Sequence, residues 1–430
     1  MSSGGGGGMP PPEEDRVLGA FAGLAVGDAA GWPAARHRSL RLAPWSRRLH
    51  RELDAFAEER QVTTLPVPFA LNQPVEPLAL GPSDDAEWLA WTATTIHEDR
   101  AEAFGRLARR DDLRARISVW SALDNLAAGL GPPASGHDNP HFFDDAAAVR
   151  AVAFGAAGMD PVADAEVTNS GDGVLGAVAI ATAVGALVRG APMREAVDAA
   201  VAVLPEDTAI GHAARTAVAV ARKHGDPFAA VPALDAALLD HVYSYGVAAA
   251  ETVPIALALA DAAMPGEGAS GSARSFTRSS TRSSTGGRGA GEAFGAAVSA
   301  AACLASVADS APALTGALAG AYAGYAALPE AWRESARTLA GCCLPELAGT
   351  DLVAVARTLA SGGPARSAPE QEGAAQEGAA LDGARQHGVA KDGQTGSGTT
   401  QSGSTDSGST DSGSTDSGST DSGSTRRGTA

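Results

Sequence analysis

The sequence has few cysteines, few aromatic residues and no long uninterrupted hydrophobic run. Its three cysteines include no CxxC pair and cannot form a disulfide framework, which fits a reducing cytoplasm. Aromatic residues make up only 5% of the chain while alanine dominates its apolar residues, a composition that favours packed helices over sheets. The N-terminus has no basic segment followed by an apolar one, so we expect no signal peptide. Apolar runs such as 174–188 fall short of the ~20 residues that span a bilayer and predict buried helices.

The balance of charge limits the possible partners. The formal net charge is −18 at pH 7, and an acidic surface repels both nucleic acid and anionic membrane. Glycine-rich phosphate-binding motifs are also missing, since no G-x-G-x-x-G follows a strand pattern and no P-loop occurs. The sequence therefore predicts a cytoplasmic all-α protein with no nucleic-acid partner, no membrane partner and no dinucleotide-binding fold.

Low-complexity segments divide the chain. Residues 1–13, 265–291 and 361–430 contain too little apolar surface to offset the entropy of ordering, and the last segment carries SGSTD repeats. We expect disorder in all three, with 265–291 as an insert loop within one helical domain over 14–360. Apolar spacing predicts a helix that begins after Ser83, and further helices near 145–158, 174–189, 208–224, 246–264, 292–306, 312–327 and 330–340.

Four separated segments carry a resemblance to a known family. They are DRVLGAFAGLAVGDAAGWP (15–33), GPSDDAEWLAWTA (81–93), AETVPIALALADA (250–262) and ACLASVADSAPALTGALAGAYAGYAALPEAW (302–332). In this order they resemble the ADP-ribosylglycohydrolases, which include the dinitrogenase-reductase-activating glycohydrolases, and the chain looks like a divergent member. The resemblance implies an all-α orthogonal helical bundle with a magnesium cleft. It also implies hydrolysis of the bond between ADP-ribose and a protein side chain or small molecule.

The resemblance also implies metal ligands. Ser83, Asp84 and Asp85 stand where the family has a Thr-Asp-Asp motif, and Asp309 and Ser310 match the end of its Gly-Gly-Asp-Thr-Asp-Thr motif. Mg²⁺ prefers carboxylate and hydroxyl oxygens, so these side chains are the expected Mg²⁺ ligands, and Asp84 and Asp85 are the expected catalytic residues. The alternative is that each motif only caps a helix.

One position of the second motif is altered. Val307 stands where the family has its first aspartate, so one ion site is expected to have lost a ligand and the cleft to hold a single ion.

Other positions of the resemblance concern the substrate. Asp144 and Asp145 stand where the family has a Gly-Asn-Gly turn, and Asn169 stands where it has a histidine. The resemblance makes these three residues substrate-binding candidates. Three alternatives stay open: a metal cluster that adds His137, Asp138 and His141 to the two acids, a helix cap by Asp144, and a cap of the following helix by Asn169.

Two functions from different classes follow. The first is a magnesium-dependent hydrolase that cleaves a glycosidic bond of an ADP-ribosyl or related ribosyl substrate, with an ADP-ribosylated protein or a small ADP-ribose-type molecule as partner. The second is a family member impaired in catalysis, which binds an ADP-ribosyl or nucleoside-like group without cleaving it. The second is motivated by Val307, by Asn169, and by alanine and arginine at 34–36, where the family often has a glutamate.

Overall fold

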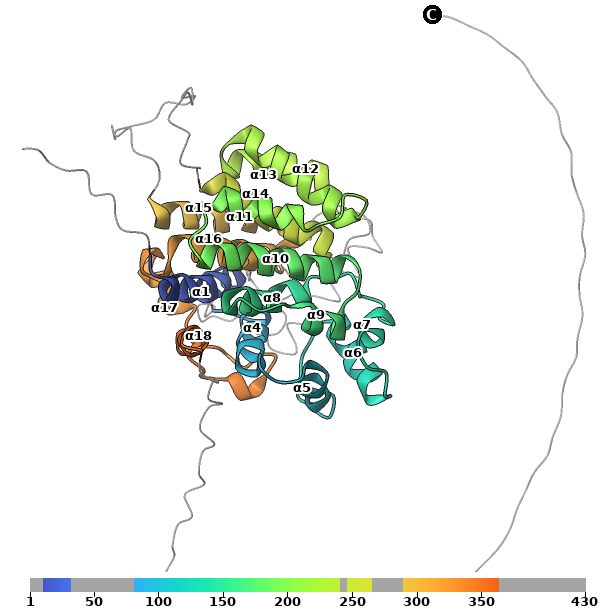
Figure 1. Ribbon diagram of the computed structural model, residues 1–430. Helices are drawn as coiled ribbons and strands as arrows, with labels where there is room; N and C mark the ends of the chain where they lie inside the picture. Colours follow the sequence, from blue (N-terminus) through green and yellow to red (C-terminus); the bar gives the residue numbers. More distant parts are fainter. Residues whose placement is uncertain (1–10, 32–80, 240–245, 265–288, 363–430) are drawn as a thin grey trace, which may run out of the picture. The chain divides into compact units, whose positions relative to one another are not determined.

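The computed structural model describes residues 11–31, 81–239, 246–264 and 289–362, all within one compact unit, Met1–Glu370 (Figure 1). Helices dominate these ranges, and no strand occurs in them beyond two isolated bridges, Asp144 with Ala248 and Thr338 with Asp351. The expected all-α class is therefore confirmed. No helix in the described ranges combines the length and apolar character needed to cross a membrane.

The described helices run through the unit in the following order. They are α1 (Glu13–Gly31), α4 (Asp84–Thr95), α5 (Arg100–Leu107), α6 (Ile117–Ala127), α7 (Ala134–His137), α8 (Ala146–Ala157), α9 (Val162–Thr168), α10 (Asp172–Val188), α11 (Met193–Ala202), α12 (Ala209–His224), α13 (Pro227–Leu238), α14 (Ala249–Ala263), α15 (Ala290–Ala302), η2 (Ala305–Val307), α16 (Ala311–Ala323), η3 (Tyr325–Ala327), α17 (Glu330–Ser335), η4 (Pro345–Leu347) and α18 (Leu352–Ala360).

The helices expected from apolar spacing are present as α4, α8, α10, α12, α14, α15, α16 and α17, and three of them end earlier than expected. Helix α16 stops at Ala323 because Gly324 adopts φ +81°, a left-handed conformation that breaks the helix. Helix α15 gives way to the short 3₁₀ turn η2. Helix α17 has a single polar turn and ends at Ser335. Most of the segments 1–13, 265–291 and 361–430 lies outside the described residues.

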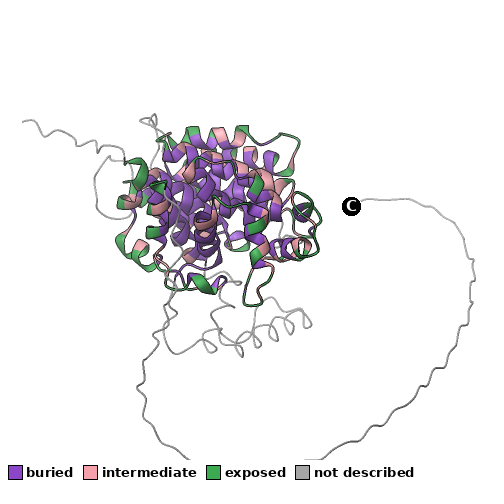
Figure 2. Ribbon diagram, turned by 60° about the horizontal axis from the view of Figure 1, so that its bottom comes forward, coloured by how far each residue is buried: buried purple, intermediate pink, exposed green. Residues whose placement is uncertain are grey.

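Helix α1 is the centre of the core. It is buried almost all the way round and packs along α16. Figure 2 shows that buried residues fill the middle of the helical unit. The contact is made by backbone, since a Cβ built on Gly23 would lie 2.1 Å from the carbonyl oxygen of Gly316, and one on Gly19 would lie 2.2 Å from that of Gly320. Only glycine permits so close an approach.

This packing places the C-terminal end of α1 beside the N-terminal end of α16. A Cβ on Gly27 would lie 2.0 Å from the carbonyl oxygen of Pro312, in the first turn of α16. Asp28 and Ser310 are therefore brought to the same end of the helix pair. That end carries the acidic residues of the next section.

A buried ion-pair group fixes the helices on the other side of the site. Asp164 in α9 accepts hydrogen bonds from Arg100 at 2.9 Å and from Arg150 at 2.7 Å. Arg150 also donates to Thr168 at 2.7 Å, and Thr168 donates to the neighbouring Asn169 at 2.6 Å. All three charged side chains of this group are paired, since Arg100 and Arg150 both bond to Asp164, as burial requires. The group holds α5, α8 and α9 together and fixes the orientation of Asn169.

Candidate active site

The first wall of the site is the start of α4, which is fixed by Asp28. The carboxylate of Asp28 accepts hydrogen bonds from the Ser83 hydroxyl at 2.5 Å, the Ser83 amide at 2.7 Å and the Ala86 amide at 3.1 Å. Ser83 is the N-cap residue of α4, but its side chain makes no capping bond. The capping alternative therefore does not describe this hydroxyl. Its bond to Asp28 instead holds Asp84 and Asp85 in the first turn of α4.

The second wall is the start of α16. Ser310 is the N-cap residue of this helix and also makes no side-chain capping bond. It is fully buried, while the side chain of Asp309 is 12% exposed. Helix packing alone brings this pair next to α4, because α1 contacts both helices. The segment thus reaches the site from more than 200 residues further along the chain than Asp84.

The third wall is the start of α8, where Asp144 and Asp145 are both fully buried. The Asp145 amide donates to the carbonyl of Val247 at 2.9 Å, next to the bridge between Asp144 and Ala248, so this turn is fastened to the segment before α14. Asp144 faces away from solvent and accepts hydrogen bonds from the Ala146 amide at 3.1 Å and the Asn169 side chain at 2.8 Å.

The side chain of Asn169 therefore makes its hydrogen bonds within the protein. Besides Asp144, its amide nitrogen donates to the carbonyl of Phe142 at 3.2 Å, and only 1% of the residue is exposed. The N-cap residue of α10 is Gly171, so Asn169 does not cap that helix as one alternative had it. The structure shows Asn169 and Asp144 holding the turn that presents Asp145. Direct contact of this pair with substrate stays a prediction.

Arg116 lies where the three walls meet. It is the residue before α6, and its side chain is 12% exposed. Its guanidinium is surrounded by one hydroxyl and four carboxylates: Ser310 at 2.6 Å, Asp85 at 3.0 Å, Asp309 at 3.3 Å, Asp84 at 3.8 Å, and Asp145, which accepts a hydrogen bond from Nη1. A single cation thus contacts acids from α4, α8 and the segment before α16.

The charges of this cluster shift the acidity of its members. Burial raises the pKa of Asp145 to about 7, even though Arg116 acts in the opposite direction. Burial and the neighbouring charge of Asp84 raise the pKa of Asp85 well above its usual range, again against the effect of Arg116. Burial works against the charge of Arg116, yet the surrounding carboxylates keep its pKa above the usual range, so it remains a cation.

The carboxylate and hydroxyl oxygens around Arg116 suit a hard divalent cation. Carboxylates and hydroxyls are the donors that Mg²⁺ binds, and one oxygen each of Asp85 and Asp145 is buried without a hydrogen-bond partner among the described residues. The expected ligands Asp84, Asp85, Asp309 and Ser310 all lie around Arg116, and Ser83 lies next to them, bonded to Asp28. The oxygen atoms of these residues therefore fit a metal ion. The guanidinium of Arg116 lies at the centre of the same group of side chains.

Two other groups of potential metal ligands include residues outside the set around Arg116. The possible cluster of His137, Asp138 and His141 with the two acids is not formed. In the described ranges, one group of three potential ligands has its ligand atoms within 4.8 Å of one another, and it is Glu87, Cys342 and Cys343. The carboxylate of Glu87, however, accepts three backbone hydrogen bonds of 2.7 to 2.9 Å from residues 342–344, which makes it a structural anchor for that loop.

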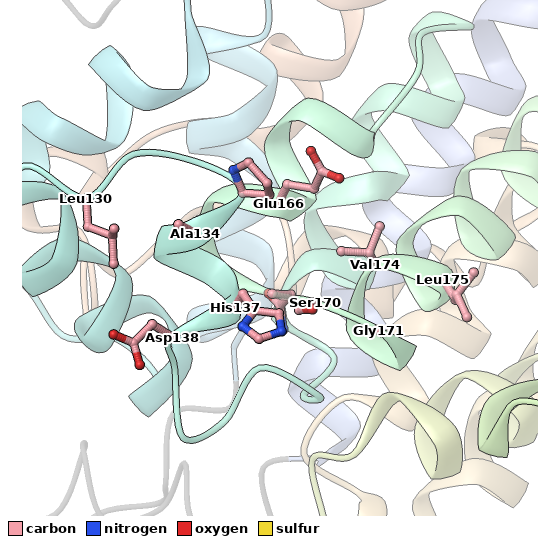
Figure 3. Close-up of a pocket in the computed structure, with 11 residues that line it drawn as sticks. Leu130, Ala134, His137, Asp138, Glu166, Ser170, Gly171, Val174 and Leu175 are labelled. Carbon is pink, nitrogen blue, oxygen red and sulfur yellow. The ribbon is translucent and has the colours of Figure 1, made fainter.

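A pocket of about 770 Å³ lies beside Asn169 and Ser170. Figure 3 shows Leu130 and Ala134 on one side of it, Val174 and Leu175 on the other, and His137 with Ser170 between them. Asn169 lines this pocket and also donates to Asp144, the residue before Asp145, so one side chain connects the pocket with the turn that presents Asp145. Among the described residues, the acidic side chains that line it are Asp138 and Glu166, and no lysine or arginine lines it.

Sequence reasoning missed Arg116 and Asp28. Arg116 ends a run that also contains Arg106, Arg109, Arg110 and Arg114, and such a run is typical of a solvated surface. Asp28 lies within the first matched segment, and its position in a Gly-Asp-Ala turn was the signal that could have found it. Val307, in contrast, is fully buried in an apolar cluster that includes Ile255, Leu304 and Ala311. The residues at 34–36 lie outside the described residues.

Comparison with known proteins identifies the family of this helical chain. The family model described as ADP-ribosylglycohydrolase matches residues 9–363, which is most of the chain. The chain belongs to the ADP-ribosylglycohydrolase family. This membership confirms the resemblance and supports a function of the glycohydrolase type.

Two other comparisons add no functional assignment. No curated protein sequence matches the chain. A solved structure described as an ADP-ribosylglycohydrolase-related protein complex is similar with a TM-score of 0.46 and 18% sequence identity, and the match covers 81% of this chain and 98% of that one.

Proposed function

We propose that the chain is a magnesium-dependent hydrolase that cleaves the glycosidic bond of an ADP-ribosyl or related ribosyl substrate in the cleft around Arg116. One observation carries the proposal. Acids from three distant segments, Asp84 and Asp85, Asp145, and Asp309, converge on one buried place at the ends of rigid helices. Burying so many like charges is costly, and such clusters are typical of functional sites.

The carboxylates suit the chemistry of glycoside cleavage. Departure of the leaving group gives the anomeric carbon oxocarbenium character, and fixed negative charge in a buried site stabilises that state. Asp84 and Asp85 are the residues we assign to this role, since both project from the first turn of α4 into the cleft. A bound Mg²⁺ would be held by Ser83, Asp84, Asp85, Asp309 and Ser310 and would supply Lewis-acid polarisation and orient substrate hydroxyls.

The neighbouring pocket bears on how the substrate lies. Because its charged lining residues are acidic, it suits a neutral or cationic part of the substrate better than the diphosphate. His137 and Ser170 offer hydrogen-bonding groups at its centre (Figure 3). We therefore place the leaving group or a ribose, and not the diphosphate, against this wall.

A panel of substrates tests the proposal. Wild type is incubated with ADP-ribosyl-arginine, an ADP-ribosyl-serine peptide and O-acetyl-ADP-ribose, each with Mg²⁺ and with a chelator, and released ADP-ribose is measured by chromatography. We expect release from at least one substrate, dependent on Mg²⁺ and reduced at least ~100-fold in Asp84→Asn. The matched control is Asp112→Asn, whose carboxylate lies at the surface beside Arg110.

The second function, binding without cleavage, is favoured by one specific observation: Val307 offers no ligand atom where the family supplies a carboxylate. Calorimetry with ADP-ribose on the same samples separates the two. Binding with no release from any substrate would reject the hydrolase and support a reader of ADP-ribosyl groups. Neither binding nor release would reject both.

A further inference from the structure

The position of Arg116 has a consequence for metal binding that neither family membership nor the proposed function contains. Its guanidinium contacts Asp85, Asp145 and Asp309 at once, which come from three separate segments. A divalent ion at the position of this guanidinium would need the same oxygens. Two cations cannot share one such place at contact distance.

The carboxylates are arranged around this guanidinium and not around a ready-made ion cage. In the described ranges, no three of the cleft acids bring ligand oxygens within 4.8 Å of one another. A planar guanidinium has donors spread over a wide fork, so acids that it bridges lie farther apart than the ligands of a small ion.

Arg116 is also held in place from its backbone. Its carbonyl accepts the Trp120 amide at 3.0 Å in the first turn of α6, and the nearby Arg114 amide donates to the carbonyl of Cys343 at 3.0 Å. The Cys343 loop is in turn fastened to Glu87 of α4. The backbone next to Arg116 is thus connected, through the Cys343 loop, to α4, the helix that carries Asp84 and Asp85.

We infer that Arg116 is a tethered cation that takes the place of one divalent ion in the cleft, so that the site binds one ion fewer than its carboxylates would otherwise hold. The guanidinium supplies fixed positive charge between α4, α8 and α16, which a second ion would otherwise supply. One divalent ion can still bind beside Asp84 and Asp85, because Arg116 bonds to Oδ1 of Asp85 and lies 3.8 Å from Asp84, while Oδ2 of Asp85 is buried without a hydrogen-bond partner among the described residues. The inference rests on the cleft of the proposed function, but its test uses no substrate.

The test counts bound Mn²⁺ by electron paramagnetic resonance and by calorimetry on the full chain. We expect one ion in wild type and in Arg116→Lys, which keeps the charge, and one additional ion in Arg116→Gln. Two ions in wild type, or equal counts in wild type and Arg116→Gln, would overturn the inference. Arg110→Gln is the matched control, because Arg110 also bridges two acids, Asp112 and Glu346, but outside the cleft. It should bind the same number of ions as wild type.

A stability measurement covers the possibility that Arg116→Gln folds poorly. Without Arg116 the cleft acids lose their cation, so we expect its melting temperature in chelator to fall well below that of wild type and to rise by at least ~5 °C more than wild type on addition of millimolar Mn²⁺. If the variant does not recover with Mn²⁺, the guanidinium is not replaced by an ion and the inference fails. The ion count and the melting temperatures measure no reaction. A failure of the substrate panel therefore does not affect the inference about Arg116, and a failure of that inference does not affect the proposed hydrolysis.

Discussion

Ser83 donates its hydroxyl hydrogen to Asp28 at 2.5 Å, and this bond joins the end of α1 to the start of α4. Two backbone amides share the same carboxylate, so the first turn of α4 is held by one side chain from 55 residues earlier. The carboxylate of Asp28 thus positions the turn that carries Asp84 and Asp85. Asp28 is a positioning residue, and its loss should disturb both stability and the site.

Asp28→Ala removes the acceptor of three buried donors. Each unsatisfied buried donor costs roughly 1–3 kcal/mol, so we expect the free energy of unfolding to fall by about 3 kcal/mol or more in denaturant titrations. Asp112→Ala, at the surface, should unfold like wild type. An Asp28→Ala protein with wild-type stability would show that α4 begins correctly without this carboxylate.

Gly23→Ala and Gly105→Ala should have opposite effects although they are the same substitution. A Cβ on Gly23 would lie 2.1 Å from the carbonyl oxygen of Gly316, whereas a Cβ on Gly105 in α5 meets nothing within 4 Å. We expect Gly23→Ala to lose about 3 kcal/mol by forcing α1 and α16 apart, and Gly105→Ala to gain roughly 0.5 kcal/mol from helix propensity. Thermal melts of both variants check this. Equal effects would mean that the helix pair tolerates separation.

Val307→Asp restores the residue type of the family motif, but it does so in an apolar place. The side chain of Val307 is fully buried with Leu304 and Ile255, so a carboxylate there is left without compensation. We expect a loss of at least about 3 kcal/mol, more than the roughly 2 kcal/mol expected for Val307→Ala, and no recovery with Mn²⁺. Full recovery of stability with Mn²⁺ would show that the new carboxylate reaches a bound ion.

Stability at low pH should depend on Asp351. Burial alone would raise its pKa, but the hydrogen bonds from Arg337 and from the amides of Val353 and Ala354 outweigh burial and hold the pKa below its usual range. A carboxylate with a lowered pKa stabilises the folded state above its unfolded pKa of about 3.9 and loses that effect as pH falls through the folded value. The gap in melting temperature between wild type and Asp351→Asn should therefore be present at neutral pH and close below about pH 4. A gap that is the same across this range would exclude the linkage.

The sequence was sufficient for much of the fold because apolar spacing survives within single segments. Helices α8, α10, α12 and α14 were expected within a few residues of their observed bounds. The sequence did not predict helices α5, α6, α7, α9, α11, α13 and α18. Their apolar faces are brief, and α9 is held by the buried charge of Asp164, which no periodicity reveals.

The sequence predicted that the acids of the two motifs meet, but it did not predict the arginine between them. Asp84 and Asp309 stand in motifs with recognisable neighbours, so their meeting in space could be expected from resemblance. Nothing near Arg116 separates it from the surface arginines before it, because its role depends on partners 31 residues before it and 29 residues after it. Asn169 and Asp144 are bonded to each other, a pairing that the resemblance did not indicate, and their contact with substrate stays a prediction.

The glycine contact between α1 and α16 sets a fixed distance that side chains do not decide. Where two helices touch through their backbones, exchanging residues in the cleft does not alter the separation of Asp28 at the end of one from Ser310 at the start of the other. The distance between α1 and α16 is therefore fixed by their backbones, whereas the side chains at the ends of the two helices can be exchanged. A chain built this way can lose a metal ligand or gain an arginine while its remaining acids stay in register. Redesign of its chemistry should therefore begin with the side chains of the cleft and leave Gly19, Gly23 and Gly27 untouched.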